Sequence, residues 1–405
     1  MVRPAVSALH TDSMKQMSSI TEMAGTRLQT SAGYVPALTS LALATLFFIT
    51  SCSTTAHSDV FEMTEVAKFE KPWAMAFLPD GRLLITERRG DLLLLSADGT
   101  PDTVSGVPAV NFGGQGGLGD VVLHPAFDDN QLVYFSYAEA GDGGSGAVVA
   151  RGRLQLDRSP AELTDVEIIW RQYPKVSGQG HYGHRIAFGP DGYLYISSGE
   201  RQKFDPAQDM QGNLGKVVRL NDDGTVPLDN PFADDGGVTA QIWSLGHRNP
   251  LGLAFDNAGQ LWVLEMGPQH GDELNLVEKG ANYGYPIVSN GDHYDGTKIP
   301  DHDTRPEFKA PAVTWIPAIS PSSLLFYNGD EFPQWRGSAF IGGLSSSALI
   351  RVTTDGANAS EVERFPMPER IRAVAEGPDG ALWLLQDGKS DDAGRLVRLT
   401  RPATP

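Results

Sequence analysis

The sequence predicts an all-β fold, and three features of the chain support this. The 405 residues include 45 glycines and 27 prolines spread along the whole length, as in proteins with many turns. Six times a turn signal precedes a short apolar strand, at intervals of about 40 to 80 residues. Few segments show a helical period. Six such units predict a six-bladed β-propeller of four-stranded antiparallel blades, because a radial array leaves no long sheet edge exposed.

The strands after the turn signals are nearly continuous apolar runs, so we expect both of their faces to be buried. They read RLLITE (82–87), QLVYFSY (131–137), YLYISS (193–198), QLWVLE (260–265), SAFIGGL (338–344) and ALWLLQ (381–386). The early segment 60–66 is expected to complete the last blade and close the ring. Two packed β-sandwiches are the alternative architecture.

The N-terminal region predicts export. Residues 37–50 form an apolar run that is too short for a comfortable membrane span and is typical of a signal-peptide core. The tetrapeptide 49–52 resembles a bacterial lipobox, and it contains Cys52, the only cysteine. We therefore expect a lipoprotein-type signal peptide over 1–51, a tether over 52–59 and one domain over 60–400. The protein would face the periplasm, lipid-anchored through Cys52. An ordinary signal with a chance cysteine is the alternative.

Charge and cysteine content exclude several classes of site. The formal net charge is −18 and no lysine or arginine cluster occurs, which argues against a nucleic-acid partner. A single cysteine rules out an internal disulfide and a cysteine-based metal site.

Four polar clusters stand out in the loops. The glycine-rich segment 113–120 lets a backbone approach a flat ligand closely. Segment 181–185 carries histidines that can accept a proton near neutral pH, and 246–250 carries an arginine suited to oxyanion charge. Segment 265–286 combines carboxylates with carbonyls near glycine and proline, which suits calcium. Taken singly, each has a plain alternative: a turn, a structural histidine, a surface ion pair or a solvated acidic loop.

Together and in this order, the clusters resemble the soluble PQQ-dependent aldose sugar dehydrogenases of the glucose/sorbosone dehydrogenase family, over about residues 60–400. The most telling segments are GKVVRLNDDGTVPLDNPF (215–232), GHRNPLGLAF (246–255), EMGPQHGDELNLVEKGANYGYP (265–286) and RIRAVAEGPDGALWLL (370–385). The resemblance implies oxidation of an aldose at its anomeric carbon to a lactone. Hydride would pass to pyrroloquinoline quinone (PQQ), with Ca²⁺ as Lewis acid, and electrons then to an external acceptor.

The resemblance also implies roles for individual residues. It places His181 as the catalytic base. The quinone contacts that it implies are Gln115, Arg248, Asn249, Arg370 and Arg372. The calcium contacts are the carbonyls of Gly267 and Pro268 on the quinone-bound ion, and Glu273 with the Tyr283 carbonyl at a second, structural ion.

Two positions depart from the family pattern. Ser345 stands where the family often has a cofactor-contacting lysine, which predicts either weaker PQQ affinity or compensation by another side chain. His184 stands where the family tends to have glycine, which predicts a narrower sugar pocket. Two other functions fit parts of the pattern: a calcium-dependent propeller lactonase, which would not need Arg370 and Arg372, and a non-catalytic propeller that binds ligands at the cell surface.

Overall fold

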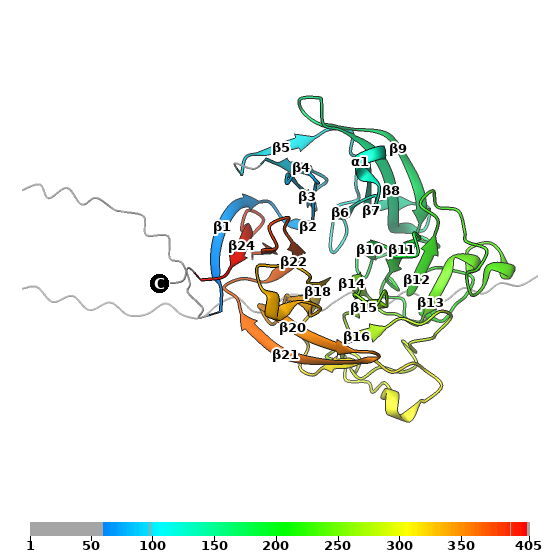
Figure 1. Ribbon diagram of the computed structural model, residues 1–405. Coiled ribbons are helices and arrows are strands. Elements are labelled where there is room, and N and C mark those ends of the chain that lie inside the picture. Colours follow the sequence, from blue (N-terminus) through cyan, green and yellow to red (C-terminus); the bar gives the residue numbers. More distant parts are fainter. Residues whose placement is uncertain (1–59, 97–98, 389, 403–405) are drawn as a thin grey trace, which may run out of the picture. The chain divides into compact units, whose positions relative to one another are not determined.

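The computed structural model describes residues 60–96, 99–388 and 390–402, and these form a six-bladed β-propeller (Figure 1). Each blade is a four-stranded antiparallel sheet, which confirms the predicted fold class. The predicted signal peptide, Cys52 and the tether lie outside the described residues. No helix within the described residues is long and apolar enough to cross a membrane.

The blades follow one another in chain order, each starting from its innermost strand. The first contains β2 (Pro72–Phe77), β3 (Leu83–Glu87), β4 (Leu92–Leu95) and β5 (Pro101–Val104). The second contains β6 (Leu118–Leu123), β7 (Leu132–Gly141), β8 (Gly144–Gln155) and β9 (Glu162–Arg171). The third contains β10 (Gly183–Phe188), β11 (Leu194–Ser198), β12 (Lys216–Leu220) and β13 (Ile242–Leu245).

The other three blades complete the ring. The fourth contains β14 (Pro250–Phe255), β15 (Leu261–Glu265), β16 (Asp272–Leu276) and β17 (Val313–Trp315). The fifth contains β18 (Pro321–Phe326), β19 (Ala339–Gly343), β20 (Ala348–Asp355) and β21 (Asn358–Pro366). The sixth contains β22 (Ile371–Glu376), β23 (Leu382–Gln386), β24 (Gly394–Thr400) and β1 (Glu62–Phe69).

Strand β1 closes the ring as predicted. It pairs antiparallel with β24, so the first strand along the chain becomes the outer strand of the last blade (Figure 1). The described helices are short: α1 (Phe127–Asn130) and the 3-10 turns η1 (Asp205–Ala207), η2 (Ala233–Asp235), η3 (Thr239–Gln241), η4 (His302–Thr304) and η5 (Pro333–Trp335).

The core lies between neighbouring blades. All six apolar runs form the second strand of a blade, and β3, β11, β15 and β19 are buried along their whole length. Trp262 and Leu264 of the fourth blade, for example, pack with Phe326 and Ile341 of the fifth. Apolar side chains on both faces of each sheet therefore hold the blades to one another.

Every inner strand has a register shift near its start. The shifts leave one or two residues unpaired in each blade: Trp73, Gly119–Asp120, His184–Arg185, Leu251, Ser322 and Arg372. Bulges re-aim side chains and are common beside active sites. Four of these side chains, Trp73, His184, Leu251 and Arg372, line the same pocket, so the repeated bulge shapes the site.

Candidate active site

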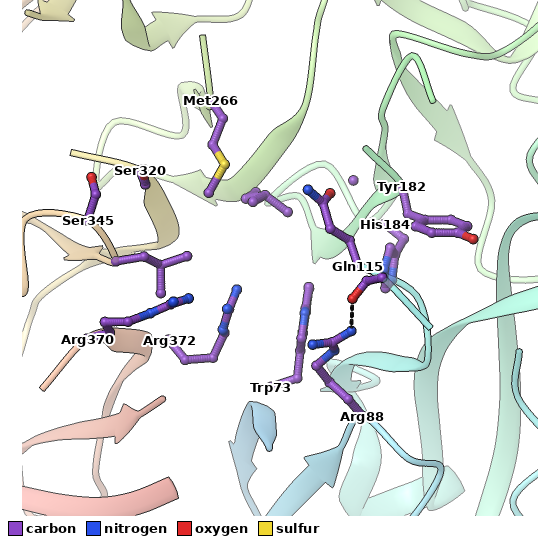
Figure 2. Close-up of a pocket in the computed structure, with 14 residues that line it drawn as sticks. Trp73, Arg88, Gln115, Tyr182, His184, Met266, Ser320, Ser345, Arg370 and Arg372 are labelled. Carbon is purple, nitrogen blue, oxygen red and sulfur yellow. Dashed lines mark hydrogen bonds between the residues drawn. The ribbon is translucent and has the colours of Figure 1, made fainter. Parts of the chain in front are cut away.

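A pocket of about 370 Å³ opens where the inner strands begin (Figure 2). It brings together the glycine-rich segment, the His184 region and the arginines that follow the fifth blade. Its lining is Trp73, Arg88, Gly114, Gln115, Tyr182, Gly183, His184, Leu251, Met266, Ser320, Leu344, Ser345, Arg370 and Arg372. Gln115, which is far from Arg370 and Arg372 in the sequence, thus lines the same pocket as they do.

His181 lies beside this pocket, in the loop between β9 and β10. Its backbone is held in the left-handed region, with φ 49°, and its side chain is buried. The Gln115 side chain accepts a hydrogen bond from the His181 backbone N–H (2.7 Å). Nδ1 of the ring is hydrogen-bonded to the Glu200 carboxylate. A non-glycine residue in this backbone region marks local strain, which is common at functional sites.

Glu200 fixes the His181 ring. Its carboxylate also accepts hydrogen bonds from the backbone N–H groups of Lys203 and Phe204, the latter at 2.7 Å. With Nδ1 engaged, Nε2 is the nitrogen left to take a proton, and no hydrogen-bond partner for it occurs among the described residues. Burial favours the neutral carboxyl, but the bond from His181 and the two backbone bonds outweigh it and hold the pKa of Glu200 below its usual value.

The electrostatics keep the His181 ring neutral near pH 7. Burial lowers the pKa of His181, and the nearby Arg248 guanidinium lowers it further, while Glu200 partly opposes the shift. A neutral imidazole with one nitrogen held by a carboxylate is the form that a general base requires. Glu200 was not predicted from the sequence. One sequence feature could have indicated Glu200: it is an acidic residue two positions after the buried strand β11. The end of β11 pairs with the start of β10, which the His181 loop precedes.

His184, in the same segment as His181, is enclosed. Nδ1 of His184 is hydrogen-bonded to the Ser136 hydroxyl (2.7 Å), and its ring stacks on Trp73 with centroids 5.1 Å apart. Burial, with the Arg185 charge next, lowers the pKa of His184 to about 3. The His184 ring lines the pocket, where the family pattern has a smaller residue.

Arg248 and Asn249 lie between the base and the fourth blade. The Arg248 carbonyl accepts a hydrogen bond from the Glu200 backbone N–H (2.9 Å). The Arg248 backbone N–H donates to Glu265 (2.7 Å), and its Nη1 donates to the Met266 carbonyl (2.9 Å). Arg248 Nε and Asn249 Oδ1 are buried and have no partner within the described part of the chain. A buried polar atom without a partner is uncommon, and these two atoms are available to a bound ligand.

Arg370 and Arg372 share one carboxylate. Asp387 accepts from Arg370 Nη2 (3.2 Å) and from Arg372 Nε (3.1 Å). Arg370 Nε is buried and, among the described residues, unpartnered. One carboxylate cannot neutralise two guanidinium groups, so the pocket keeps positive charge in a chain of net charge −18. These donors fit a flat, polyanionic quinone such as PQQ.

The predicted calcium contacts gather around a second, much smaller cavity. Gly267, Pro268, Glu273 and Tyr283 all line it, together with Glu265. No hydrogen bond reaches the carbonyl oxygens of Gly267 or Pro268 from the described residues. Burial, with the neighbouring Glu265 carboxylate next, raises the pKa of Glu273 well above its usual range. Paired buried carboxylates and free carbonyls are a donor set that a hard cation would stabilise.

The donor set has two further features. No group of three or more His, Cys, Asp or Glu side chains that could hold a metal occurs in the described residues, so a calcium ion would depend on backbone carbonyls. His302 also lies at the second predicted ion site, with Nε2 3.1 Å from the Tyr283 carbonyl oxygen and Nδ1 3.9 Å from Glu273. The fit is therefore better for the ion at Gly267 and Pro268.

Ser345 lines the pocket at the position where the family often has lysine. Its hydroxyl donates to the Ala318 carbonyl (3.2 Å), and its short side chain brings no positive charge. Figure 2 shows Ser345 on the same side of the pocket as Arg370 and Arg372.

A family model described as Glucose / Sorbosone dehydrogenase matches residues 69–398. The chain belongs to this family. It is 42% identical to aldose sugar dehydrogenase YliI of Escherichia coli (strain K12) over 343 residues, which cover 82% of this chain and 91% of the relative. Membership confirms the resemblance and the enzyme class, a PQQ-dependent sugar dehydrogenase.

Two solved structures of the family are similar to the chain. The soluble aldose sugar dehydrogenase from Escherichia coli, in its apo-form, is 40% identical, with 84% of this chain and 100% of that chain covered and a TM-score of 0.79. The PQQ-bound aldose sugar dehydrogenase from Streptomyces coelicolor is 28% identical, with coverages of 85% and 99% and a TM-score of 0.70. The roles of individual residues in this chain stay predictions.

Proposed function

We propose that this family member oxidises an aldose at its anomeric carbon to the lactone, with PQQ and calcium at the cofactor site and an external electron acceptor. One observation carries the proposal. A neutral histidine, held at Nδ1 by a buried glutamate, lies beside a pocket lined by Arg88, Arg370 and Arg372. Arg370 in this pocket, and Arg248 and Asn249 in the loop next to the histidine pair, have buried polar atoms without partners among the described residues.

His181 is the base in this proposal. Its Nε2 accepts the proton of the anomeric hydroxyl, and the Glu200 carboxylate stabilises the imidazolium that results. Two hydrogen bonds fix the position of this pair relative to the pocket. The His181 backbone N–H donates to Gln115, and the Glu200 backbone N–H donates to the Arg248 carbonyl. Pre-organisation of this kind lowers the barrier because the groups need not rearrange during reaction.

The cofactor site has separate parts. Arg370 and Arg372 would hold the quinone carboxylates, with Gln115 at the edge of the quinone. Arg248, which lines the smaller cavity, and Asn249 would face the quinone carbonyl oxygens. The carbonyls of Gly267 and Pro268 would hold the calcium ion. When bound, PQQ supplies the hydride acceptor, and calcium supplies Lewis-acid polarisation of the quinone.

Reconstitution tests this function. Purified apo-protein is titrated with PQQ in the presence of Ca²⁺, and aldose oxidation is followed with an artificial electron acceptor. We expect activity only with both additions, loss of activity with a calcium chelator, and the lactone as product by NMR. Matched samples without PQQ are the control. Lactone hydrolysis without PQQ would instead support a lactonase, and sugar binding without turnover would support a binding module.

We also propose that the protein is exported and anchored by lipid at Cys52, facing the periplasm. The support is sequence alone: an apolar segment over 37–50 ends just before the single cysteine. More than one lipid chain is needed for stable anchoring, since each buried CH₂ contributes about 0.8 kcal/mol. Mass spectrometry of the mature protein should find a lipidated N-terminal cysteine. An unmodified Cys52, or cleavage elsewhere, would refute the proposal.

A further inference from the structure

A third arginine, Arg88, lines the same pocket as Arg370 and Arg372. It follows strand β3 directly, and its backbone is fixed because its carbonyl accepts the Leu118 N–H (3.1 Å). Figure 2 shows Arg88 next to the Gln115 segment, across the pocket from the other two arginines. The pocket is therefore lined by guanidinium groups from opposite sides.

Arg88 differs from the other two arginines in its partners. Arg370 and Arg372 both contact Asp387, whereas Arg88 forms no ion pair with any described residue. Its Nη2 donates to the carbonyls of Gly114 and Gly116 instead, the latter at 3.1 Å. These are neutral acceptors. Besides them, the described residues offer the Arg88 guanidinium only weaker attractions, from the Phe112 ring 5.5 Å away and from the more distant Asp387 and Asp391 carboxylates.

The surroundings make this charge costly. Arg88 is partly buried, and burial, with the Arg372 charge next, lowers the pKa of its guanidinium. A partly desolvated cation that faces another cation destabilises the site unless an anion lies between them. Among the described residues no carboxylate lines the pocket, and Asp387, which attracts Arg88 from farther away, is already shared by Arg370 and Arg372.

We propose that Arg88 is a further cofactor-binding residue, whose guanidinium contacts a negatively charged group of the quinone from the side opposite Arg370 and Arg372. The inference rests on the proposed function. It has a second consequence, because the Gly114 and Gly116 carbonyls that Arg88 holds flank Gln115, and Gln115 accepts the His181 backbone N–H. The Arg88 side chain thus contributes both to cofactor binding and, through the Gln115 segment, to the position of His181.

The test is PQQ binding to apo-protein with calcium present, followed by quenching of tryptophan fluorescence, since Trp73 lines the pocket. Arg88→Met is compared with Arg89→Met. Arg89 is the adjacent residue, pairs with Asp391 and does not line the pocket, so it is a matched control. We expect Arg88→Met to weaken PQQ binding by about 10- to 100-fold, as for loss of a charge-assisted hydrogen bond, and Arg88→Lys to weaken it less. Arg89→Met should bind as wild type does.

A second ligand separates charge recognition from a loosened loop. The trimethyl ester of PQQ keeps the quinone but lacks carboxylate charge. Arg88→Met should reduce the preference of the protein for PQQ over the ester, whereas a purely structural defect would weaken both ligands equally. Equal weakening, or wild-type PQQ binding by Arg88→Met, would overturn the inference and leave the proposed function standing. If wild-type protein binds no PQQ, the proposed function fails and the inference falls with it.

Discussion

The third and fourth blades each hold a histidine against a buried glutamate, and the two pairs have different surroundings. In the third blade, His181 contacts Glu200 through Nδ1, and Nε2 has no partner among the described residues. In the fourth blade, His247 contacts Glu265 through Nδ1 (2.9 Å), while Nε2 is engaged by the Ser244 hydroxyl (2.8 Å).

The comparison separates a reactive pair from a supporting pair. His247 is fully buried and stacks on Tyr283, with centroids 4.8 Å apart, so neither of its nitrogens can reach a substrate. Glu265 uses its other oxygen to hold the Arg248 backbone N–H. The His181–Glu200 pair therefore provides a base, because one ring nitrogen is free. The His247–Glu265 pair, in which both ring nitrogens are occupied, holds the backbone of the neighbouring Arg248 in place.

Replacement of the base should have the largest effect. His181→Ala removes the only proton acceptor in the proposed mechanism, and turnover should fall by about 10²- to 10⁴-fold, the usual contribution of a general base. PQQ and calcium binding should remain, because neither is assigned to His181. Turnover is measured on protein saturated with both. A rate within a few-fold of wild type would mean that another group is the base.

Replacement of the carboxylate beside the base should have the next largest effect. Glu200→Gln keeps the shape but loses the charge that stabilises the imidazolium. We expect turnover to fall by about 10- to 100-fold, since a hydrogen bond to a charged group contributes about 1.5–3 kcal/mol. The matched variant is Glu265→Gln, the equivalent change in the fourth blade. Equal losses of turnover in both, at equal cofactor occupancy, would remove the distinction between the pairs.

The cofactor arginines should affect affinity rather than rate. Arg370→Ala and Arg372→Ala should each raise the PQQ concentration needed for half-maximal activity, by about 10- to 100-fold for a charge-assisted contact. Arg364→Ala, an arginine paired with Glu361 outside the pocket, is the control. PQQ titrations that do not change in either pocket variant would count against this cofactor site.

The enclosed pair should affect stability. His247→Gln leaves Glu265 and Ser244 short of a buried partner, and the free energy of unfolding should fall by about 1–3 kcal/mol in urea titrations. The pH dependence of the remaining activity should not move. A shifted pH dependence would show that His247 takes part in proton transfer.

A new cation at Ser345 should have the smallest effect. Ser345→Lys adds an ammonium group to the pocket wall, and we expect PQQ to bind about 2- to 10-fold more tightly, as for one additional exposed ionic hydrogen bond. Isothermal titration of apo-protein measures this. Ser345→Met, similar in length but uncharged, should give no gain. Weaker binding by Ser345→Lys would indicate that the pocket is already crowded with positive charge.

Most of the fold could be predicted from the sequence because its signals are local. Turn residues followed by apolar runs mark the second strand of all six blades, and the segment at 60–66 pairs with the last blade as expected. The register shifts could not be predicted. They depend on how the six inner strands pack around one axis. Because of these shifts, the side chains of Trp73, Leu251 and Arg372 line the pocket.

The site was predicted less completely. The sequence indicated Gln115, Arg370 and Arg372, which line one pocket, because polar clusters interrupt apolar repeats. It also indicated His181, which lies beside this pocket, and Arg248, which lines the smaller cavity. It missed Glu200 and Asp387, which each follow a strand and have no motif of their own. Their roles arise only from tertiary contacts, when a carboxylate meets a histidine or two arginines from elsewhere in the chain. Cys52 and the signal peptide remain predictions.

The pH dependence of kcat/KM, compared between wild type and Glu200→Gln, tests the central claim most directly. His181 must be neutral to act, and burial holds its pKa below 6.5, so wild-type activity should fall only in acid, below that value. Glu200 raises the pKa of His181, so its loss should move this acid limb to still lower pH. An acid limb at or above pH 6.5, or one that stays in place in Glu200→Gln, would contradict the assignment of this pair as the base.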